Sequence, residues 1–410
     1  MKHLPIGNAE YINRLNKIKI LSLIREQGEI SRAELVKRSG VSAPTVTRIV
    51  DSLINREKLV VELGAGESSG GRPPLMVIFN GSANYIIGID WGRTHIYGVL
   101  ANLNAETILE IDLPTEINHD FETDLNKLFG LIEFLIEKSG IDKQKLLGIG
   151  VAAAGFVNRH NGIIEFSPNF NWKNVDIRRP IEERFDVRVK VDNVSRLMAL
   201  GELWYGIGQK IRNFIFINIG YGIGAGIIID GKPFAGADGI SGEFGHLTLL
   251  NPPAETRTCL CGKANCLESF ASGRGIAETA RLQAMAAPKS LLSMMCSNRP
   301  ERLTAELTAK AARAGDETAL TIFTQTAEML GISAANFAHL FNPEAVVLGG
   351  KVSNAGDFFF DKIHEVFNRE QLPFTSRKVK LIPSELKESA AVKGAVSLIL
   401  QEVLNLNVFP

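Results

Sequence analysis

The sequence of 410 residues has no apolar run close to the ~20 residues that a membrane-spanning helix needs. Its N-terminal segment, MKHLPIGNAEYINRLNK, has no apolar core of the kind found in a signal peptide. These two absences argue against an integral membrane protein and a secreted one, so we expect the protein in the cytoplasm. With 45% hydrophobic and 22% charged residues, the composition is that of a globular protein of two or three domains.

Cysteine is scarce, and three of the four cysteines fall within eight residues. This distribution does not resemble the disulfide framework of a secreted protein. The formal net charge of the whole chain is zero, but residues 1–80 hold 12 basic and 8 acidic side chains. The modest excess of positive charge at this end favours an acidic partner there.

The first part of the chain predicts a helix-turn-helix. Apolar residues recur at helical spacing through EYINRLNKIKILSLIREQ, which a glycine follows. In ISRAELVKRSG, Ser31 and Glu34 have the spacing of a capping box, and Gly40 is the expected terminator. The next helix opens with Ser42 as its cap. A short helix, a tight turn and a second helix in this order are typical of a DNA-binding motif.

Candidate DNA contacts lie near the start of that second helix, where a recognition helix meets base edges. They are Ser42, Thr45, Thr47 and Arg48. Two apolar segments, LVVEL and LMVIFN, flank the stretch GAGESSGGRPP and predict a hairpin, or wing, whose Arg72 is a candidate minor-groove contact. The alternative is a helical protein-interaction module followed by a linker. The order of caps, turn and wing favours DNA binding.

From residue 85 the pattern changes to that of an α/β protein. YIIGID, IYGVLANL and TILEIDLP predict three strands, and the turn DWGRT after the first can wrap a phosphate with backbone N–H groups. Glycines recur in INIGYGIGAGIIIDG and AVVLGGKV, where they allow close backbone approach. One such loop is usually only a turn, but their repetition suggests two α/β lobes facing a cleft. Arg93 and Tyr221 add bulk inside these loops and argue against a working nucleotide site.

The strongest chemical signal is a group of metal-binding residue types in GEFGHLTLLNPPAETRTCLCGKANCLESF. Cys259, Cys261 and Cys266 follow His246. Three thiolates and one imidazole fit a closed, tetrahedral, structural zinc site. The alternative is buried packing of free cysteines, which three cysteines in eight residues make hard to sustain. Cys296 lies outside this spacing, and we expect it to be a small buried hydrophobe.

The segments GIDWGRTHI, IGYGIGAG, SGEFGHL and CLCGKANCLE together resemble the ROK family of bacterial repressors and sugar kinases. The resemblance runs from residue 85 to about residue 400, and its most specific part is the Cys-rich motif with the upstream GExGH. It implies an actin-like, sugar-kinase fold in two lobes. The helix-turn-helix matches the family's repressor branch, which includes N-acetylglucosamine and xylose repressors, because the kinases generally lack it.

The resemblance also implies a sugar site between the lobes. Its residues in this sequence are Asn169, Asn193, Glu243, His246 and Glu268. A carboxylate accepts a sugar hydroxyl in a charge-assisted hydrogen bond, which is stronger than a neutral one. His246 would then serve two sites, with one ring nitrogen on zinc and the other toward a hydroxyl. Outside this context, Glu243 and Glu268 would be ordinary solvated carboxylates.

One position departs from the family's kinases, for which the resemblance implies a general-base aspartate directly after the sugar-binding asparagine. Here the segment VDNVSR has Val194 at that position. Valine cannot take a proton, and general-base assistance is worth about 10²–10⁴ in rate. Asp192 lies two residues upstream and could substitute as the base, but a misplaced catalytic group loses much of its effect on the rate. We therefore predict no catalytic residue and a domain that senses sugar, with a five-carbon sugar as one candidate.

The sequence thus predicts an α/β protein in three parts, namely a winged helix-turn-helix (1–80), a first α/β lobe (81–208) and a second α/β lobe (209–410). The final helix, ESAAVKGAVSLILQEVL, is expected to pack back onto the first lobe. The predicted function is sugar-responsive transcriptional regulation, with operator DNA and a sugar as partners and no membrane. Because helix-turn-helix regulators usually bind two half-sites, we expect a homodimer or larger.

Two alternative functions stay open. One is a sugar kinase with an appended DNA-binding domain, which ATP-dependent turnover would reveal. The other is a regulator that a sugar-transport protein sequesters, for which aromatics such as those in GDFFFDKI could serve. Helical packing is the favoured use of that aromatic run, because such runs are usually core.

Overall fold

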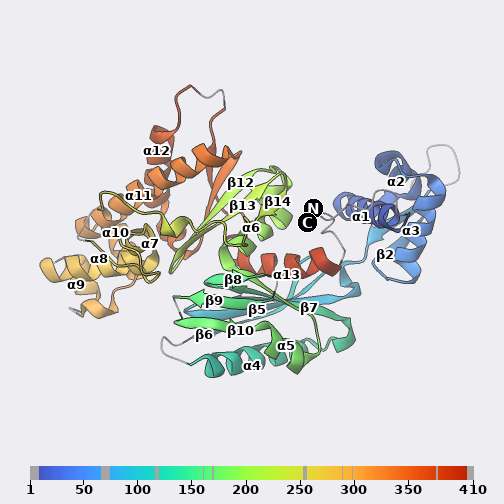
Figure 1. Cartoon of the computed structure of the whole chain (residues 1–410), viewed down its shortest axis with the longest axis horizontal. Coiled ribbons are helices and arrows are strands. Elements are labelled where there is room, and N and C mark those ends of the chain that lie inside the picture. The colour runs from blue at the N-terminus through green and yellow to red at the C-terminus, as the bar shows by residue number, and fades with distance from the viewer. Residues whose placement is uncertain are drawn as a thin grey trace.

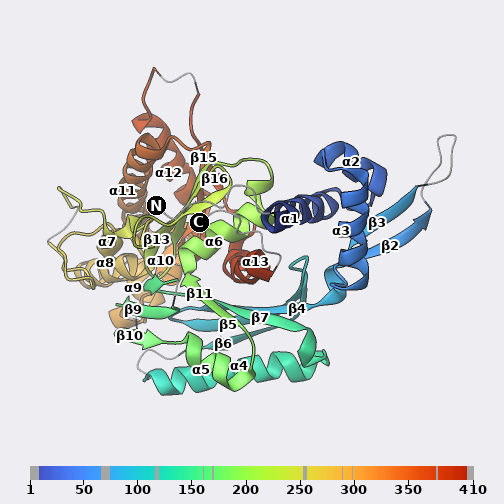
Figure 2. The same cartoon turned by 45° about the vertical axis from the view of Figure 1, so that its right-hand side comes forward.

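The computed structural model describes residues 9–65, 74–115, 120–159, 161–168, 170–252, 256–288, 290–297, 299–374 and 377–403. A small helical unit, blue in Figures 1 and 2, stands to one side of two larger α/β units. This arrangement confirms the predicted fold class. No helix among the described residues is both long and apolar enough to cross a bilayer.

The first unit contains three helices and a three-stranded sheet of order β1-β3-β2. Its elements are α1 (Ala9–Gln27), β1 (Ile30–Ser31), α2 (Arg32–Ser39), α3 (Ala43–Asn55), β2 (Val60–Ala65) and β3 (Leu75–Phe79). Gly40 ends α2 in the left-handed conformation at φ 66°, as predicted. Strands β2 and β3 pair antiparallel, as a wing requires. The predicted tip of the wing, including Arg72, lies outside the described residues.

The caps of the two short helices differ in part from the prediction. The Ser31 hydroxyl accepts the backbone N–H of Glu34 at 3.1 Å, as expected of a cap. The reciprocal half of the capping box is wrong, because the Glu34 carboxylate instead accepts a hydrogen bond from Arg38 Nε at 2.7 Å. Ser42 occupies the predicted N-cap position of α3, but its side chain accepts no backbone N–H there, and its hydroxyl lies 2.9 Å from that of Thr45. In each case a nearby side chain, Arg38 for Glu34 and Thr45 for Ser42, offers a hydrogen-bond partner that competes with the helix cap.

The first α/β unit is built on a five-stranded sheet of order β11-β7-β4-β5-β6, whose strands β11, β7 and β4 are parallel. These strands are β4 (Tyr85–Trp91), β5 (His95–Asn102), β6 (Thr107–Pro114), β7 (Leu146–Ala153) and β11 (Val189–Asn193). Helices α4 (Phe121–Ser139) and α5 (Arg178–Phe185) cover one face, and α13 (Ala390–Val403) covers the other (Figure 1). A small sheet of β8 (Phe156–Asn158), β9 (Ile163–Ser167) and β10 (Trp172–Asp176) lies beside it.

The second α/β unit has a five-stranded sheet of order β14-β13-β12-β15-β16. Its strands are β12 (Phe214–Ile219), β13 (Ile223–Ile229), β14 (Lys232–Phe234), β15 (Ala345–Gly349) and β16 (Lys380–Pro383). The helices that follow β14 and β15 are α7 (Glu268–Ala271), α8 (Gly273–Ala286), α9 (Leu291–Met295), α10 (Ala305–Arg313), α11 (Glu317–Phe341) and α12 (Asp357–Glu370). Two similar five-stranded α/β units on one chain agree with the predicted two-lobed fold.

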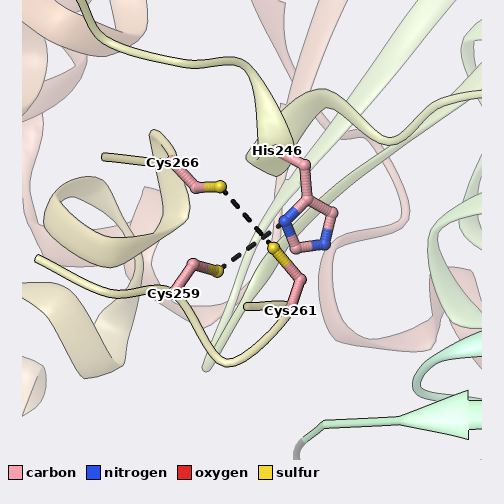
Figure 3. Close-up of side chains that lie close together, drawn as sticks. All are labelled: His246, Cys259, Cys261 and Cys266. Carbon is pink, nitrogen blue, oxygen red and sulfur yellow. Dashed lines mark hydrogen bonds between the residues drawn. The ribbon is translucent and has the colours of Figure 1, made fainter. Parts of the chain in front are cut away.

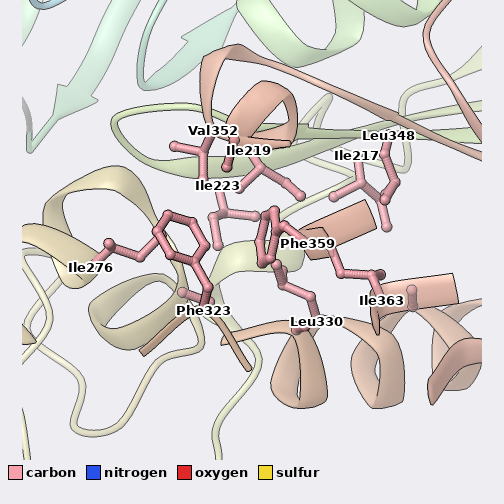
Figure 4. Packing of buried hydrophobic residues seen from close by; sticks show 14 of the residues in the cluster. Ile217, Ile219, Ile223, Ile276, Phe323, Leu330, Leu348, Val352, Phe359 and Ile363 are labelled. Carbon is pink, nitrogen blue, oxygen red and sulfur yellow. The ribbon is translucent and has the colours of Figure 1, made fainter. Parts of the chain in front are cut away.

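The core of this second unit lies between its sheet and helices α8, α11 and α12 (Figure 4). Phe323 of α11 and Phe359 of α12 meet edge to face, with ring centroids 5.0 Å apart. Phe359 is fully buried, and Phe358 and Phe360 pack against the same core. The aromatic run of α12 therefore packs internally, which removes the feature that favoured sequestration by a transport protein.

Two helices lie between the two large sheets (Figures 1 and 2). These are α6 (Val194–Tyr205), which directly follows β11, and α13. They approach so closely that a Cβ on Gly201 would meet the Ala390 carbonyl, and one on Gly394 would meet the Leu197 carbonyl. Buried residues of α6, α13 and the second sheet form one core cluster. The helix pair thus contacts both lobes.

Candidate functional site

A cavity of about 620 Å³ separates the two α/β lobes. The first lobe lines it with the β4–β5 turn and with the carboxyl ends of β7 and β11. The second lobe contributes the β12–β13 turn, the 3-10 turn η4 (Phe244–His246) and the start of α7. Carboxyl ends of parallel strands are where open α/β sheets bind ligands. Asn193, Glu243, His246 and Glu268, predicted from scattered motifs, all line this one cavity.

Asn193 is held at the first-lobe wall by three hydrogen bonds. Its Oδ1 accepts the backbone N–H groups of Ser195 at 2.9 Å and Arg196 at 3.3 Å, so it caps α6. Its Nδ2 donates to the Gly155 carbonyl at 2.9 Å. An amide nitrogen carries two hydrogens, so one remains to meet a ligand. The cap fixes the direction of that second N–H before any ligand arrives.

Glu243, His246 and Glu268 form the opposite wall. Glu268 is buried, and its Oε2 accepts the backbone N–H of Ile223 at 2.8 Å. Glu243 Oε2 lies 3.8 Å from His246 Nε2. Burial raises the pKa of Glu243, while the nearby positive charges of His246 and Arg196 oppose the shift. Because these carboxylates are poorly solvated, hydroxyl donors from a ligand would replace lost water contacts.

Val194 lines the cavity and occupies the position at which we expect the catalytic base of a related kinase. Asp192 does not replace it. Its Oδ1 accepts Arg196 Nε at 2.8 Å and the backbone N–H of Asn193 at 2.7 Å, and both charged side chains are buried. Asp192 is not among the residues that line the cavity. A buried carboxylate paired with an arginine is a structural ion pair, and freeing it to take a proton would leave the arginine unpaired.

Two contacts also occupy the loops predicted to wrap phosphate. The Arg93 guanidinium lies 5.7 Å from the centre of the Tyr221 ring, so the first-lobe turn meets the second-lobe turn across the cleft. In the same first-lobe turn, His95 Nε2 lies 3.7 Å from Asp90 Oδ2. Side chains of the protein itself therefore contact one another within and beside the two loops that the sequence predicted to wrap phosphate.

The glycines of the second loop serve a purpose that the sequence did not reveal. Gly224 and Gly226 lie within β13 rather than in its turn. A Cβ on Gly224 would come 2.5 Å from Ser195 Oγ, and one on Gly226 would come 2.6 Å from the Ser195 carbonyl. These glycines admit α6 against the sheet, so helix packing and not phosphate binding explains them.

The predicted metal ligands form one compact group (Figure 3), of which His246 also lines the cavity. The ligand atoms of His246, Cys259, Cys261 and Cys266 all lie within 4.8 Å of one another. Cys259 Sγ is 3.8 Å from His246 Nδ1, and Cys261 Sγ is 3.7 Å from Cys266 Sγ. Tetrahedral zinc with Zn–S bonds of ~2.3 Å separates two sulfurs by ~3.8 Å. The four donors therefore have the chemistry and spacing that a tetrahedral metal ion requires.

Electrostatics inside this group also fit a bound cation. Burial opposes ionisation of Cys259, but hydrogen bonds from His246 and Cys261 outweigh it and lower the pKa of Cys259. Burial and the neighbouring Cys259 raise the pKa of Cys266. One thiolate thus hinders formation of the next, and a divalent cation would remove that conflict. Cys296 is buried away from the group, as predicted.

Sequence reasoning missed Phe156, which lines the cavity and stacks on His246 with ring centroids 5.9 Å apart and planes 16° apart. Phe156 lies just beyond the carboxyl end of β7. Its position at the same sheet edge as Asn193 could have indicated it. Asn169, the remaining predicted sugar contact, lies outside the described residues.

The four predicted DNA contacts of α3 gather at the start of that helix. Ser42, Thr47 and Arg48 are exposed, and Thr45 is half-buried. Arg48 donates a hydrogen bond to Asn13 Oδ1 of α1. The opposite face of α3 packs into the core of the unit through Val46, Ile49, Val50 and Leu53. The helix therefore presents one polar face to solvent, as a recognition helix must.

Comparison with protein families gives two matches. Residues 86–402 match the ROK family, and residues 14–59 match the MarR family. The xylose repressor of Caldicellulosiruptor bescii is 34% identical, over 98% of this chain and 99% of the repressor. The similarity to this relative therefore includes both the helix-turn-helix and the two lobes.

Solved structures give the same division. A ROK family transcriptional regulator, described as a homologue of the E. coli MLC protein, superposes with a TM-score of 0.81 and 28% identity, over 97% of this chain and 99% of its own. A ROK family glucokinase from Streptomyces griseus, in complex with glucose and AMPPNP, gives a TM-score of 0.68 and 28% identity. It covers 77% of this chain and 99% of its own. The regulator spans nearly the whole chain, whereas the kinase spans about three quarters.

Proposed function

The chain belongs to the ROK family, and from that premise we propose how it works as a sugar-responsive transcriptional repressor. The winged helix binds operator DNA, and the cleft between the lobes binds a sugar. The observation that carries the proposal is a cleft with sugar-binding residue types on both walls and Val194 at the position of a base. We divide the chain into 1–80, 81–208 and 209–410 for these tasks. A repressor of chromosomal genes acts in the cytoplasm.

We propose that the effector is a pentose held by Asn193 on one wall and by Glu243, His246 and Glu268 on the other. The similarity to a xylose repressor supports this class of sugar. The test is a panel of D-xylose, D-glucose, N-acetylglucosamine and D-ribose added to the full-length protein. D-xylose should raise the melting temperature most, because ligand binding stabilises the folded state by mass action. No shift with any of these sugars would contradict the proposal.

We propose that His246, Cys259, Cys261 and Cys266 hold one structural zinc ion per chain. Four protein ligands complete a tetrahedron and leave no position for a catalytic water. His246 would bind through Nδ1, which faces Cys259, and would keep Nε2 toward the cavity and Glu243. The ligands would then orient Glu243 and Glu268, which lie three and two residues from His246 and Cys266.

DNA binding should depend on the start of α3. We expect Arg48→Ala to weaken operator binding by roughly 5- to 150-fold, because a good base contact is worth about 1–3 kcal/mol. Operator fragments can be obtained by selecting random duplexes with the full-length protein, and affinity measured by fluorescence anisotropy at one fixed salt concentration. Arg56→Ala is the matched control, because Arg56 carries the same charge at the far end of α3. Equal losses for both variants would contradict a specific contact.

We propose that the protein binds its operator as a homodimer, because a winged helix reads one half-site and operators usually hold two. The selected duplexes should then contain an inverted repeat. Light scattering of the protein bound to such a duplex should give two chains per DNA. A single half-site bound by one chain would exclude the dimer.

The second candidate function is a sugar kinase with an added DNA-binding unit, favoured by the glucokinase similarity of the lobes. We expect no ADP release when wild type is mixed with Mg-ATP and D-xylose or D-glucose, because Val194 cannot act as base and Arg93 meets Tyr221 across the cleft. A coupled assay for ADP measures this. Val194→Asp serves as the comparison, and turnover by wild type itself would establish the kinase.

A further inference from the structure

Helix α6 begins in the cavity and ends at the DNA-binding unit. Its cap Asn193 and its residues Val194, Ser195 and Met198 line the cavity. Its last residue, Tyr205, contacts α1 of the winged helix. At a rise of ~1.5 Å per residue, the helix spans ~16 Å between these two ends. One rigid element therefore touches both the proposed sugar site and the DNA-binding unit.

The contact at the far end is made by Arg25 of α1. Its guanidinium lies 4.6 Å from the centre of the Trp204 ring and 5.5 Å from that of Tyr205. Arg25 Nη2 also donates a hydrogen bond to the Tyr205 hydroxyl at 3.0 Å. A cation that both faces the aromatic rings and bonds to one of them fixes direction as well as distance. We call this set of Arg25, Trp204 and Tyr205 the arginine clasp.

The packing of α6 makes it sensitive to lobe movement. On one side Ser195 fits against Gly224 of the second-lobe sheet, and Asn218 Nδ2 of that sheet donates to Ser195 Oγ at 3.3 Å. On the other side Gly201 packs against α13, which covers the first-lobe sheet. Neither Gly224 nor Gly201 has room for a Cβ. Helix α6 therefore cannot shift freely against the second-lobe sheet or against α13. A change in the relative position of the lobes would therefore shift α6 against at least one of these two neighbours.

Movement of α1 would reach the recognition helix. Ile20, Leu21 and Ile24 of α1 are buried in the same core as Val46 and Val50 of α3. Packed cores transmit displacement because they are close-packed and nearly incompressible. The first turn of α3, which carries the candidate DNA contacts, therefore follows α1.

We propose that α6 transmits sugar binding to the winged helix through the arginine clasp. This inference rests on the proposed function, and it names the element that couples its two sites. A sugar that contacts both walls favours the closed cleft, and its effect on DNA binding equals its differential affinity for the two states. The clasp is the part that converts the displacement of α6 into a displacement of α1.

The test measures coupling rather than binding. Operator affinity is determined with and without D-xylose, and D-xylose affinity with and without operator, for full-length wild type, Arg25→Ala, Arg25→Lys and Tyr205→Phe. The ratio of operator affinities without and with D-xylose should equal the ratio of D-xylose affinities without and with operator. In wild type both ratios should be about 5- to 150-fold. Arg25→Ala should bring both ratios close to one while changing D-xylose affinity of the DNA-free protein by less than about twofold. Arg25→Lys and Tyr205→Phe should give intermediate ratios, because each keeps part of the clasp.

Lys17→Ala is the matched control, because Lys17 also lies on α1 and pairs with Glu57 inside the DNA-binding unit. It should keep the full coupling ratio. A merely structural role for Arg25 would lower stability or operator affinity but leave the ratio intact, and that result would overturn the inference. If Arg25→Ala does not fold, Tyr205→Phe decides, because it removes only the hydroxyl, and an unchanged ratio in this variant would overturn the inference.

The outcomes separate this inference from the function on which it rests. Wild type that couples D-xylose to DNA while the clasp variants also couple fully disproves only the clasp. Wild type that binds neither D-xylose nor a selected duplex disproves the proposed function and the clasp with it. Loss of coupling in the clasp variants, with both binding activities retained, supports both.

Discussion

Cys261→Ser is expected to abolish zinc binding and to lower both stability and sugar affinity. Structural zinc is worth about 10–16 kcal/mol of binding free energy in isolated zinc-finger peptides, so losing one ligand of four should cost at least about 3 kcal/mol here. For a domain of this size, that cost corresponds to a melting temperature roughly 6–12 °C lower. Elemental analysis should fall from one zinc per wild-type chain to nearly none, and calorimetry should show the lower melting temperature.

Sugar affinity should fall with the metal because of the chain's geometry. His246 lies beside Glu243 in the cavity wall, and Cys266 is followed two residues later by Glu268. Without a metal ion bound by both His246 and Cys266, the segment that carries Glu243 is no longer held against the segment that carries Glu268. Cys296→Ser is the control, because it makes the same substitution at a cysteine that is buried but lies outside the metal group. Wild type purified without chelator and free of zinc would contradict the prediction at once.

Glu243→Gln is expected to move the response to D-xylose to roughly 10- to 150-fold higher concentrations while leaving DNA binding nearly intact. The substitution keeps the shape of the side chain and removes the charge that strengthens its hydrogen bonds to hydroxyl groups. Charge-assisted hydrogen bonds contribute about 1.5–3 kcal/mol, so D-xylose affinity should fall roughly 10- to 150-fold. Isothermal titration calorimetry measures the loss. Operator affinity without sugar should stay within about twofold of wild type, because the residue lies in the cleft and not in the DNA-binding unit.

Glu278→Gln gives the control for that experiment, since Glu278 is a half-buried residue of α8 that lies outside the cavity lining and pairs with Arg274. It should bind and respond like wild type. Asn193 would be a poorer choice for the test, because its side chain also caps α6 and its loss would disturb the helix. A Glu243→Gln protein that responds to D-xylose at the same concentrations as wild type would place the effector elsewhere.

Much of the fold was predictable from short segments. Gly40 ends α2 in the left-handed conformation because its neighbours alone require it. The strands at 85–91, 95–102 and 107–114 follow from alternating and continuous apolar runs. Where prediction failed locally, as with the Glu34 half of the capping box, another residue one helical turn away offered a stronger partner.

For the candidate site, too, some features were predictable from short segments and others were not. Spacing alone indicated the metal group, because Cys259, Cys261 and Cys266 are close in sequence. Spacing could not reveal that Asp192 is engaged with Arg196, that Phe156 stacks on His246, or that Gly224 makes room for α6. Each of these depends on which surfaces the sheets bring together.

The sequence by itself determined the order of the elements, the metal-binding residue types and the valine at position 194, because these depend on residue identity and on neighbours a few positions away. Only the tertiary structure decided how the parts communicate. Arg25 and Tyr205 are 180 positions apart, and their contact exists because α6 is wedged between two sheets and ends beside α1. No local periodicity encodes such a contact, because packing of distant surfaces depends on the shape of the whole chain.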